Sequence, residues 1–217
     1  MTALKFHNGS SERTFGQGPA GDVGRIAWSA MATIFEAIQS GDAAAVQKTL
    51  ADDPAAVDAR RDDGVSAVRA ALYLQRQDLA DVVLAAGPTL DMFDAAAVGD
   101  LDRLTALLDS DPALANAWSS DGFGPLHLAA FFGRGDAVRL LLDRGADVHA
   151  AARNDLRVQA LHSAVAARST EIVAALLVAG ADPNARQQGD FTPIMAARQH
   201  DDAALVRLLL DHGAETA

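Results

Sequence analysis

The stretch 122–157 contains the parts of a two-helix unit, and its features recur elsewhere in the chain. Pro125 suits the first turn of a helix, where its missing N–H is not needed. Gly133 can adopt the left-handed conformation that ends this helix, and Asp136 favours the start of a second one. Gly145 then predicts the end of the second helix. One such unit cannot bury its own apolar face, so the sequence predicts that it stacks on copies of itself.

The copies follow at a regular period. The dipeptide Leu126-His127 recurs 35 residues later as Leu161-His162, and Ile194-Met195 follows 33 residues after that. The triplet Gly-Ala-Asp at 145–147 also recurs at 180–182. This pattern resembles the ankyrin repeat, which has a period of about 33 residues and the signature Thr-Pro-Leu-His-x-Ala. More narrowly, FGPLHLAAFFGR and ADPNARQQGDFTPI resemble a widespread group of bacterial ankyrin-repeat proteins without an assigned reaction.

The resemblance implies an all-α ankyrin-repeat solenoid of about six helix-turn-helix repeats with short β-hairpin fingers, spanning residues 31–217. Half of the residues are hydrophobic and only 5% are aromatic, which suits short, closely packed helices rather than a sheet sandwich. We expect the repeats at about residues 34–63, 64–91, 92–121, 122–156, 157–189 and 190–217.

Residues 1–30 show no helical periodicity and are rich in Gly, Ser and polar groups. We expect them to be a disordered tail, either dispensable or upstream of a natural start at Met31. They contain the spacing Gly16-x-Gly18-x-x-Gly21 of a dinucleotide-binding loop, but no strand leads into it. A nucleotide site is therefore not expected there.

The junction between the second and third repeats is unusually short. The path from Gly87 to Ala95 is about eleven residues shorter than the equivalent path from Gly145 to Ala164, so a finger is expected to be missing and to leave a notch. Gly and Pro positions also recur with a constant offset of 58 residues, which indicates that 34–91 and 92–149 are copies of a two-repeat module. Between repeats four and five, two extra residues predict a longer finger.

The net charge of −11 argues against nucleic acid as the main partner, because phosphate binding requires a positive field. No apolar run is long enough to span a membrane, and no signal pattern is present at the N-terminus. We therefore expect a cytoplasmic monomer that binds neither nucleic acid nor membrane. The absence of Cys excludes disulfides and thiolate metal sites.

The residue types that could carry catalysis have structural interpretations. The resemblance implies that the imidazoles of His127 and His162 form hydrogen bonds between neighbouring repeats. Stacked repeats lie about 10 Å apart, so these two residues cannot share a metal ion, whose ligands lie about 2 Å away. Acidic pairs such as Asp52-Asp53 fit loop and cap positions. No catalytic motif is present, so the sequence predicts no enzyme activity, no metal and no cofactor.

The candidate binding residues are aromatic, arginine and polar side chains on the concave face and on the finger tips. Aromatic residues and Arg most often dominate the binding energy of protein interfaces. The candidates are Tyr73, Trp118, Phe123, Phe131, Phe132, Arg153, Asn154, Arg157, Arg186 and Gln187. Each phenylalanine of the Phe131–Phe132 pair could equally be a core residue. The finger arginines suggest an acidic peptide, held by bidentate contacts to its carboxylates.

These observations favour a non-catalytic module that binds a partner protein or peptide. Two alternatives remain open. A pocket formed by the 87–95 notch and the Phe131–Phe132 region could bind a small anionic metabolite or support an unrecognised reaction. The repeats could instead serve only as a structural spacer or assembly part.

Overall fold

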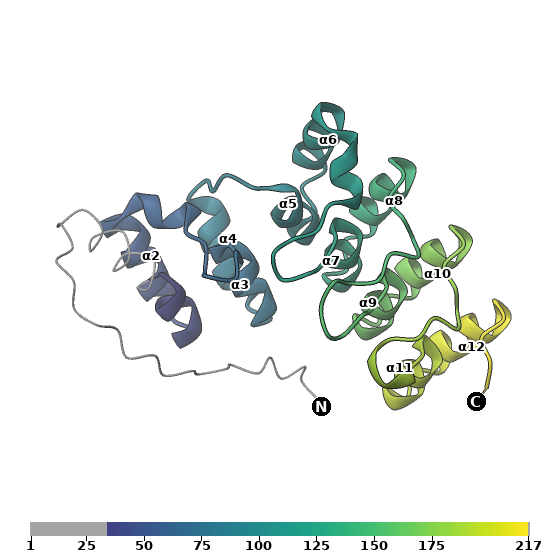
Figure 1. Ribbon diagram of the computed structural model, residues 1–217. Helices are drawn as coiled ribbons and strands as arrows, with labels where there is room; N and C mark the ends of the chain where they lie inside the picture. Colours follow the sequence, from purple (N-terminus) through teal and green to yellow (C-terminus); the bar gives the residue numbers. More distant parts are fainter. Residues whose placement is uncertain (1–33, 217) are drawn as a thin grey trace, which may run out of the picture.

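The computed structural model describes residues 34–216, so the expected tail at residues 1–30 lies outside the described part. Within that part, twelve helices pack as pairs along a curved array (Figure 1). The predicted all-α solenoid of about six helix pairs is confirmed. The first and second helices of the pairs form two rows, each stacked along the array.

The first helices of the pairs are residues 34–40, α3 (Ala67–Tyr73), α5 (Met92–Val98), α7 (Pro125–Phe131), α9 (Ala160–Ala166) and α11 (Pro193–Gln199). The second helices are α2 (Ala43–Asp52), α4 (Gln77–Ala85), α6 (Leu101–Ser110), α8 (Gly135–Asp143), α10 (Thr170–Val178) and α12 (Ala203–Asp211). Three short 3-10 helices lie in the connections: η1 (Pro54–Asp58), η2 (Pro112–Asn116) and η3 (Gln188–Asp190).

The local signals in repeat four act largely as expected. Pro125 is the first residue of α7, and Gly133 and Gly145 follow α7 and α8 with φ angles of 72° and 81°. Asp136 lies in the first turn of α8 rather than at its cap, which is Arg134 without a side-chain hydrogen bond. The carboxylate therefore acts on the positive end of the helix dipole instead of capping a particular N–H group.

The offset of 58 residues extends to the helix bounds. The helices α2, α3 and α4 begin and end 58 residues before α6, α7 and α8, and the helix before α2 ends at residue 40, which is 58 residues before the end of α5. The first two pairs and the next two are thus built to the same plan. They differ in how they connect to the pair that follows. Sixteen residues separate α8 from α9, whereas only six separate α4 from α5.

The connections that lead into α3, α7, α9 and α11 form four fingers. We call residues 60–66 finger A, 118–124 finger B, 152–158 finger C and 185–191 finger D. Fingers A, B and D each close with a backbone hydrogen bond across four residues, as from Ser119 N–H to the Phe123 carbonyl in finger B. Finger C closes with a hydrogen bond from the Ala152 N–H to the Val158 carbonyl, which spans two more residues than in the other fingers. The predicted longer finger is therefore present. Among the described residues the fingers contain no strand, only an isolated bridge between Arg60 and Ser66.

The row of fingers is continuous even though one finger is missing. The Arg153 N–H of finger C donates to the Gly122 carbonyl of finger B (2.8 Å). At the short junction, the Ser120 hydroxyl of finger B donates to the Asp63 carbonyl of finger A. Because residues 86–91 are too few to form a finger, A and B become direct neighbours. The predicted notch is therefore closed at the finger row.

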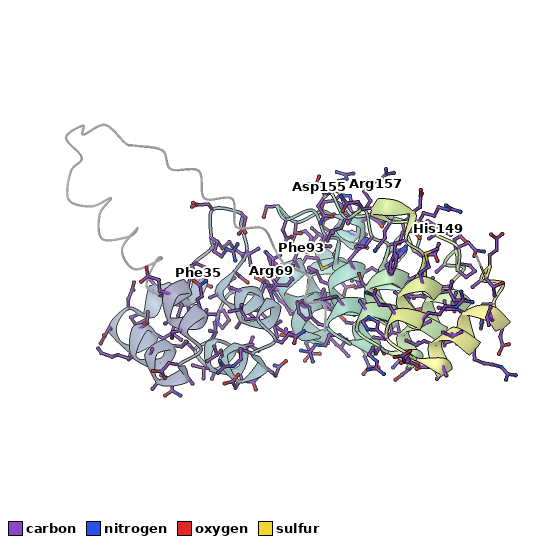
Figure 2. All side chains as sticks on the ribbon, turned by 90° about the horizontal axis from the view of Figure 1, so that it is seen from below. Phe35, Arg69, Phe93, His149, Asp155 and Arg157 are labelled. Carbon is purple, nitrogen blue, oxygen red and sulfur yellow. The ribbon has the colours of Figure 1, made fainter. Side chains whose placement is uncertain are left out.

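Asparagine side chains tie each connection to the next at two places. The Asn116 amide donates to the Gly145 carbonyl (2.9 Å), and its oxygen accepts from the Asp147 N–H (2.7 Å). Asn184 forms the same pair of bonds with Gly213 (3.0 Å) and Glu215 (2.8 Å). His149 occupies the equivalent position between repeats four and five, where its side chain is exposed (Figure 2).

Replacing His149 by Asn should stabilise the array, because the amide can form the two bonds that Asn116 and Asn184 form. Exposed hydrogen bonds contribute modestly, so we expect a gain of about 0.5–1 kcal/mol. Urea unfolding of the purified protein measures it. Asn116→Ala, which removes the same bonds elsewhere, should lose a similar amount. An unchanged midpoint in H149N would show that the site cannot accept the asparagine geometry.

Replacing Gly122 by Ala should destabilise the array more than replacing Gly133 by Ala. Both residues have a positive φ, 84° and 72°, which costs a Cβ-bearing residue about 1–2 kcal/mol. A Cβ at Gly122 would also lie 2.9 Å from the carbonyl carbon of Arg153, whereas a Cβ at Gly133 would meet nothing within 4 Å. We expect the overpacking to add about 1–3 kcal/mol for G122A alone. Equal midpoints in chemical unfolding would contradict the close approach of fingers B and C.

Candidate functional site

A pocket of about 490 Å³ lies where the first helices of repeats four to six meet the fingers. We call it the central pocket. It is partly open to solvent, and its lining is largely apolar and aromatic with a few uncharged polar groups. The lining residues are Tyr73, Phe123, His127, Leu128, Phe131, Leu156, Val158, His162, Ser163, Ala166, Gln187, Phe191, Ala196, Gln199 and His200.

The hollow follows from the size of one residue. Phe131, Ala166 and Gln199 are the last residues of α7, α9 and α11, so they occupy the same position in three consecutive repeats. All three line the central pocket. The small, exposed side chain of Ala166 between two large ones leaves the space that a larger residue would fill.

The fingers supply the opposite wall of the central pocket. Phe123 of finger B and Phe191 of finger D occupy equivalent positions, two residues before α7 and α11. Leu156 and Val158 of finger C lie between them along the row and also line the pocket. The two walls thus repeat the same structural positions along the array, as expected for a surface that follows the solenoid.

The aromatic side chains at the end of α7 have different roles. Phe132 is partly buried against the hydrophobic core and lies 5.6 Å from the Tyr73 ring centroid. Phe131 forms an edge-to-face pair with Phe132, with centroids 5.1 Å apart, and lines the central pocket. Phe132 is therefore a packing residue, and Phe131 is the one available to a ligand.

His127 and His162 connect first helices to the fingers that follow. The His127 Nε2 atom lies 3.1 Å from the Val158 carbonyl, and His162 Nε2 lies 3.1 Å from the Ala185 carbonyl. Since a carbonyl only accepts, both Nε2 atoms must carry the proton. Burial lowers the pKa of His127 to about 4 and lowers the pKa of His162. Both imidazoles are neutral near pH 7, and the interpretation of these residues as inter-repeat bonds agrees with the geometry.

One nitrogen of His127 is left without a partner. His127 is 2% exposed, and its Nδ1 atom forms no hydrogen bond. A Cβ built on Gly124 would lie 3.2 Å from this nitrogen, because Gly124 occupies the place of the threonine in the Thr-Pro-Leu-His signature. Repeat six has the threonine but lacks the histidine, because Met195 takes its place. The buried Thr192 hydroxyl there has no hydrogen-bond partner. These unpaired atoms reflect changes within the repeat pattern and need no ligand.

Trp118 and Arg153 form a stack beside the central pocket. The Arg153 guanidinium lies 4.8 Å from the Trp118 ring centroid, and the Trp118 and His127 centroids are 5.6 Å apart. All three line a second pocket of about 420 Å³ on the other side of His127. The stack fixes an exposed cation on finger C, since a cation over an indole face is attracted to its quadrupole.

The remaining candidates lie on fingers C and D. Asn154 donates to the Asp121 carbonyl (3.1 Å), so it joins fingers B and C. Arg157 is exposed, with a φ of 52°. Arg186 forms an exposed ion pair with Asp190 (3.7 Å), and Gln187 lines the central pocket. The structure therefore brings Tyr73, Phe123, Phe131 and Gln187 into one pocket, places Trp118 and Arg153 in the second, and leaves Arg157 and Arg186 on the finger surface.

Most arginines near the concave face are already paired. Arg60 contacts Asp91 and Asp94, Arg61 contacts Asp63, Arg76 contacts Asp78, and Arg168 contacts Asp202. Of the finger arginines in the described part of the chain, Arg153 and Arg157 form no salt bridge. The positive charge available to a partner therefore lies on finger C.

The short junction does not contribute to either pocket. None of residues 87–95 lines the central pocket or the second pocket. The buried side chains of Arg69 and Asp94 meet across the junction, with their Nε and Oδ1 atoms 2.8 Å apart. Neither of these two pockets therefore extends to the junction, and the metabolite pocket expected there stays a prediction.

Sequence reasoning missed several residues that the structure brings together. Ala166, Phe191 and Gln199 carried a usable signal, because each occupies the repeat position of Phe131 or Phe123. The pairing of Arg69 with Asp94 could also have been predicted from the sequence. The two residues hold the third position of α3 and α5, where α7 carries His127, and their charges are opposite.

Residues 34–216 contain no group of three or more His, Cys, Asp or Glu side chains arranged to hold a metal ion. No helix in this range has the length and apolar character needed to cross a membrane.

Comparisons with known proteins agree with the repeat pattern. Residues 92–187 match the family model of ankyrin repeats in three copies, and residues 189–216 match the single ankyrin repeat. A probable E3 ubiquitin-protein ligase from Oryza sativa subsp. japonica is 43% identical over 93 residues, which are 42% of this chain and 20% of the ligase.

A putative ankyrin repeat-containing protein of Treponema pallidum (strain Nichols) is 35% identical over 118 residues, 54% of this chain and 38% of that protein. The human B-cell lymphoma 3 protein is 34% identical over 113 residues, 49% of this chain and 24% of that protein. The chain thus spans between a fifth and two fifths of these relatives. They come from a plant, a bacterium and a mammal, so they do not assign the chain to a bacterial group.

The burial of His127 predicts a pH dependence of stability. Its pKa is about 4 in the folded protein and about 6.5 in an unfolded chain, so the unfolded state binds more protons. Stability should be full above pH 6.5 and fall by about 3 kcal/mol as the pH drops to 4. His127→Gln can still donate to Val158 but cannot titrate. Urea unfolding at several pH values should give a shallower loss in H127Q, and parallel curves would contradict the assignment.

Proposed function

Because this chain belongs to the ankyrin-repeat family, we propose that it is a non-catalytic interaction module whose central pocket binds a partner protein or peptide. The observation that carries the proposal is the uncharged aromatic lining of the pocket. Solvent-accessible apolar concavities with a few polar groups are typical of binding sites, and aromatic anchors dominate interface energies. Phe123, Phe131 and Phe191 provide such anchors.

The partner is proposed to insert an apolar side chain into the central pocket and to carry acidic groups beside it. Finger C supports this arrangement. Leu156 and Val158 line the pocket, while Arg153 and Arg157 lie in the same finger with no salt bridge among the described residues. Guanidinium groups bind carboxylates through paired hydrogen bonds, so a segment crossing finger C can satisfy both requirements.

A protein partner fits the central pocket better than a small anionic metabolite does. No Arg or Lys lines this pocket, and the buried His127 and His162 are neutral near pH 7 because burial lowers their pKa. An anion entering it would lose hydration without meeting a compensating charge. An apolar side chain has no such cost.

Filling the central pocket tests the proposal. We expect Ala166→Trp to reduce the partner recovered by affinity capture from the source cells by at least about tenfold, because the indole occupies the space the partner needs. Val178→Trp is the matched control. Val178 is 82% exposed on α10 and does not line either pocket, so this variant should recover the partner normally. Thermal unfolding checks that both variants fold.

The possible outcomes separate the functions. A stoichiometric partner recovered equally by the wild type and both variants would place the binding surface elsewhere. Recovery of no partner by any of them would favour a purely structural role. A166W could lose the partner while Arg153→Ala and Arg157→Ala retain it at low and moderate salt. That result would support the central pocket as the binding site and contradict the proposal that the partner is acidic.

A further inference from the structure

We propose that the short junction between α4 and α5 is a hinge, about which residues 34–90 and residues 91–216 move as two bodies. The hinge concerns the fold alone. Its consequence, that the movement shifts Tyr73 relative to the rest of the central pocket, rests on the proposed function.

Helix packing across this junction is weaker than elsewhere in the array. The first helices α5, α7, α9 and α11 pack extensively on one another, whereas α3 contacts α5 much less. The second helices α6, α8, α10 and α12 also pack in sequence, but α4 and α6 are not closely packed. In a solenoid each repeat is stabilised chiefly by its neighbours. The junction is therefore the least strongly coupled step in the described array.

The hydrophobic core runs through the junction, and a set of polar contacts also crosses it. The Asp94 carboxylate accepts from Arg69 Nε (2.8 Å), from the Ser66 hydroxyl (2.6 Å) and from Arg60 (3.0 Å). Arg69 and Asp94 are each 1% exposed. In Figure 2 Arg69 lies beside Phe93 near the middle of the array, with the guanidinium 5.8 Å from the ring centroid.

A second set of polar contacts joins α3 to finger B over the same junction. The Tyr73 hydroxyl donates to Asp121 (2.8 Å), and an Arg69 nitrogen lies 3.5 Å from the same carboxylate. Burial alone would lower the pKa of Arg69, but Asp94 and Asp121 raise it overall. The arginine therefore stays charged and holds carboxylates from both α5 and finger B.

The chemistry of these polar contacts is suited to a hinge, because such contacts can break and form again. Apolar burial gives stability in proportion to area and tolerates sliding, whereas ion pairs and hydrogen bonds need defined geometry and can be replaced by water. An opened junction hydrates its charges, which recovers much of the lost interaction.

The hinge divides the central pocket unequally. Tyr73 belongs to the N-terminal body, while the other lining residues lie between Phe123 and His200 in the C-terminal body. Tyr73 is placed by its bond to Asp121 and by its contact with Phe132. Opening the junction would break that bond and withdraw Tyr73, which widens the pocket at this end.

Distance measurements between spin labels test the hinge directly, because the chain has no Cys and accepts two engineered ones. One pair joins Ala85→Cys at the end of α4 to Asp143→Cys at the end of α8, across the junction. The control pair joins Asp143→Cys to Asp211→Cys at the end of α12, within the C-terminal body. We expect the distance distribution across the junction to be about twice as broad as the control. Equally narrow distributions would overturn the hinge.

Arg69→Leu should weaken the contacts across the junction, because it leaves the Asp94 carboxylate buried with fewer partners. We expect amide hydrogen exchange in α2–α4 to quicken on the order of a hundredfold, while α9–α12 stay unchanged. Arg139→Leu is the matched control, because Arg139 bridges α8 and α10 through exposed pairs with Asp136 and Glu171. Faster exchange along the whole array in R69L, or no change, would show that there are not two bodies. Neither measurement involves a partner, so failure of the hinge leaves the proposed function to its own test.

Discussion

No helix pair in this chain can bury its own apolar face, and the rest of the structure depends on that constraint. Each first helix must stack on the next, and each finger must bond to its neighbour, before either is stable. Residues such as Leu128, Leu141, Leu161 and Leu176 are almost fully buried because repeats on both sides cover them. Small interruptions of the period therefore matter more here than in a globular core, since nothing else holds adjacent repeats together.

The third position of the first helix shows how the array handles such an interruption. Where a full finger follows, His127 and His162 donate to a backbone carbonyl in that finger. Between α4 and α5 there is no finger and hence no carbonyl to bind. The same position there carries Arg69 and Asp94, which bond directly to each other. One structural requirement, a polar link between consecutive repeats, is met by neutral imidazoles at the junctions after repeats four and five and by a buried ion pair at the short one.

The features beyond what stacking requires gather around repeats four and five. Ala166 opens a hollow between Phe131 and Gln199, and the longer finger C brings Arg153 over Trp118 at its edge. The apolar pocket can supply binding energy, and the cations beside it can supply orientation and selectivity. The proposed hinge adds a movable wall, because Tyr73 comes from the other side of the junction.

The sequence by itself determined the repeat, the order of the helices and the positions that end them, because proline, glycine and apolar spacing act over a few residues. It also indicated the offset of 58 residues, the longer finger C and the structural role of His127. Only the tertiary structure decided that Phe131 lines a pocket while Phe132 packs, that the missing finger leaves no gap in the finger row, and that Arg69 meets Asp94. The physical reason is that these outcomes depend on which side chains face each other across neighbouring repeats, and the stacking geometry sets this at distances that local sequence patterns do not encode.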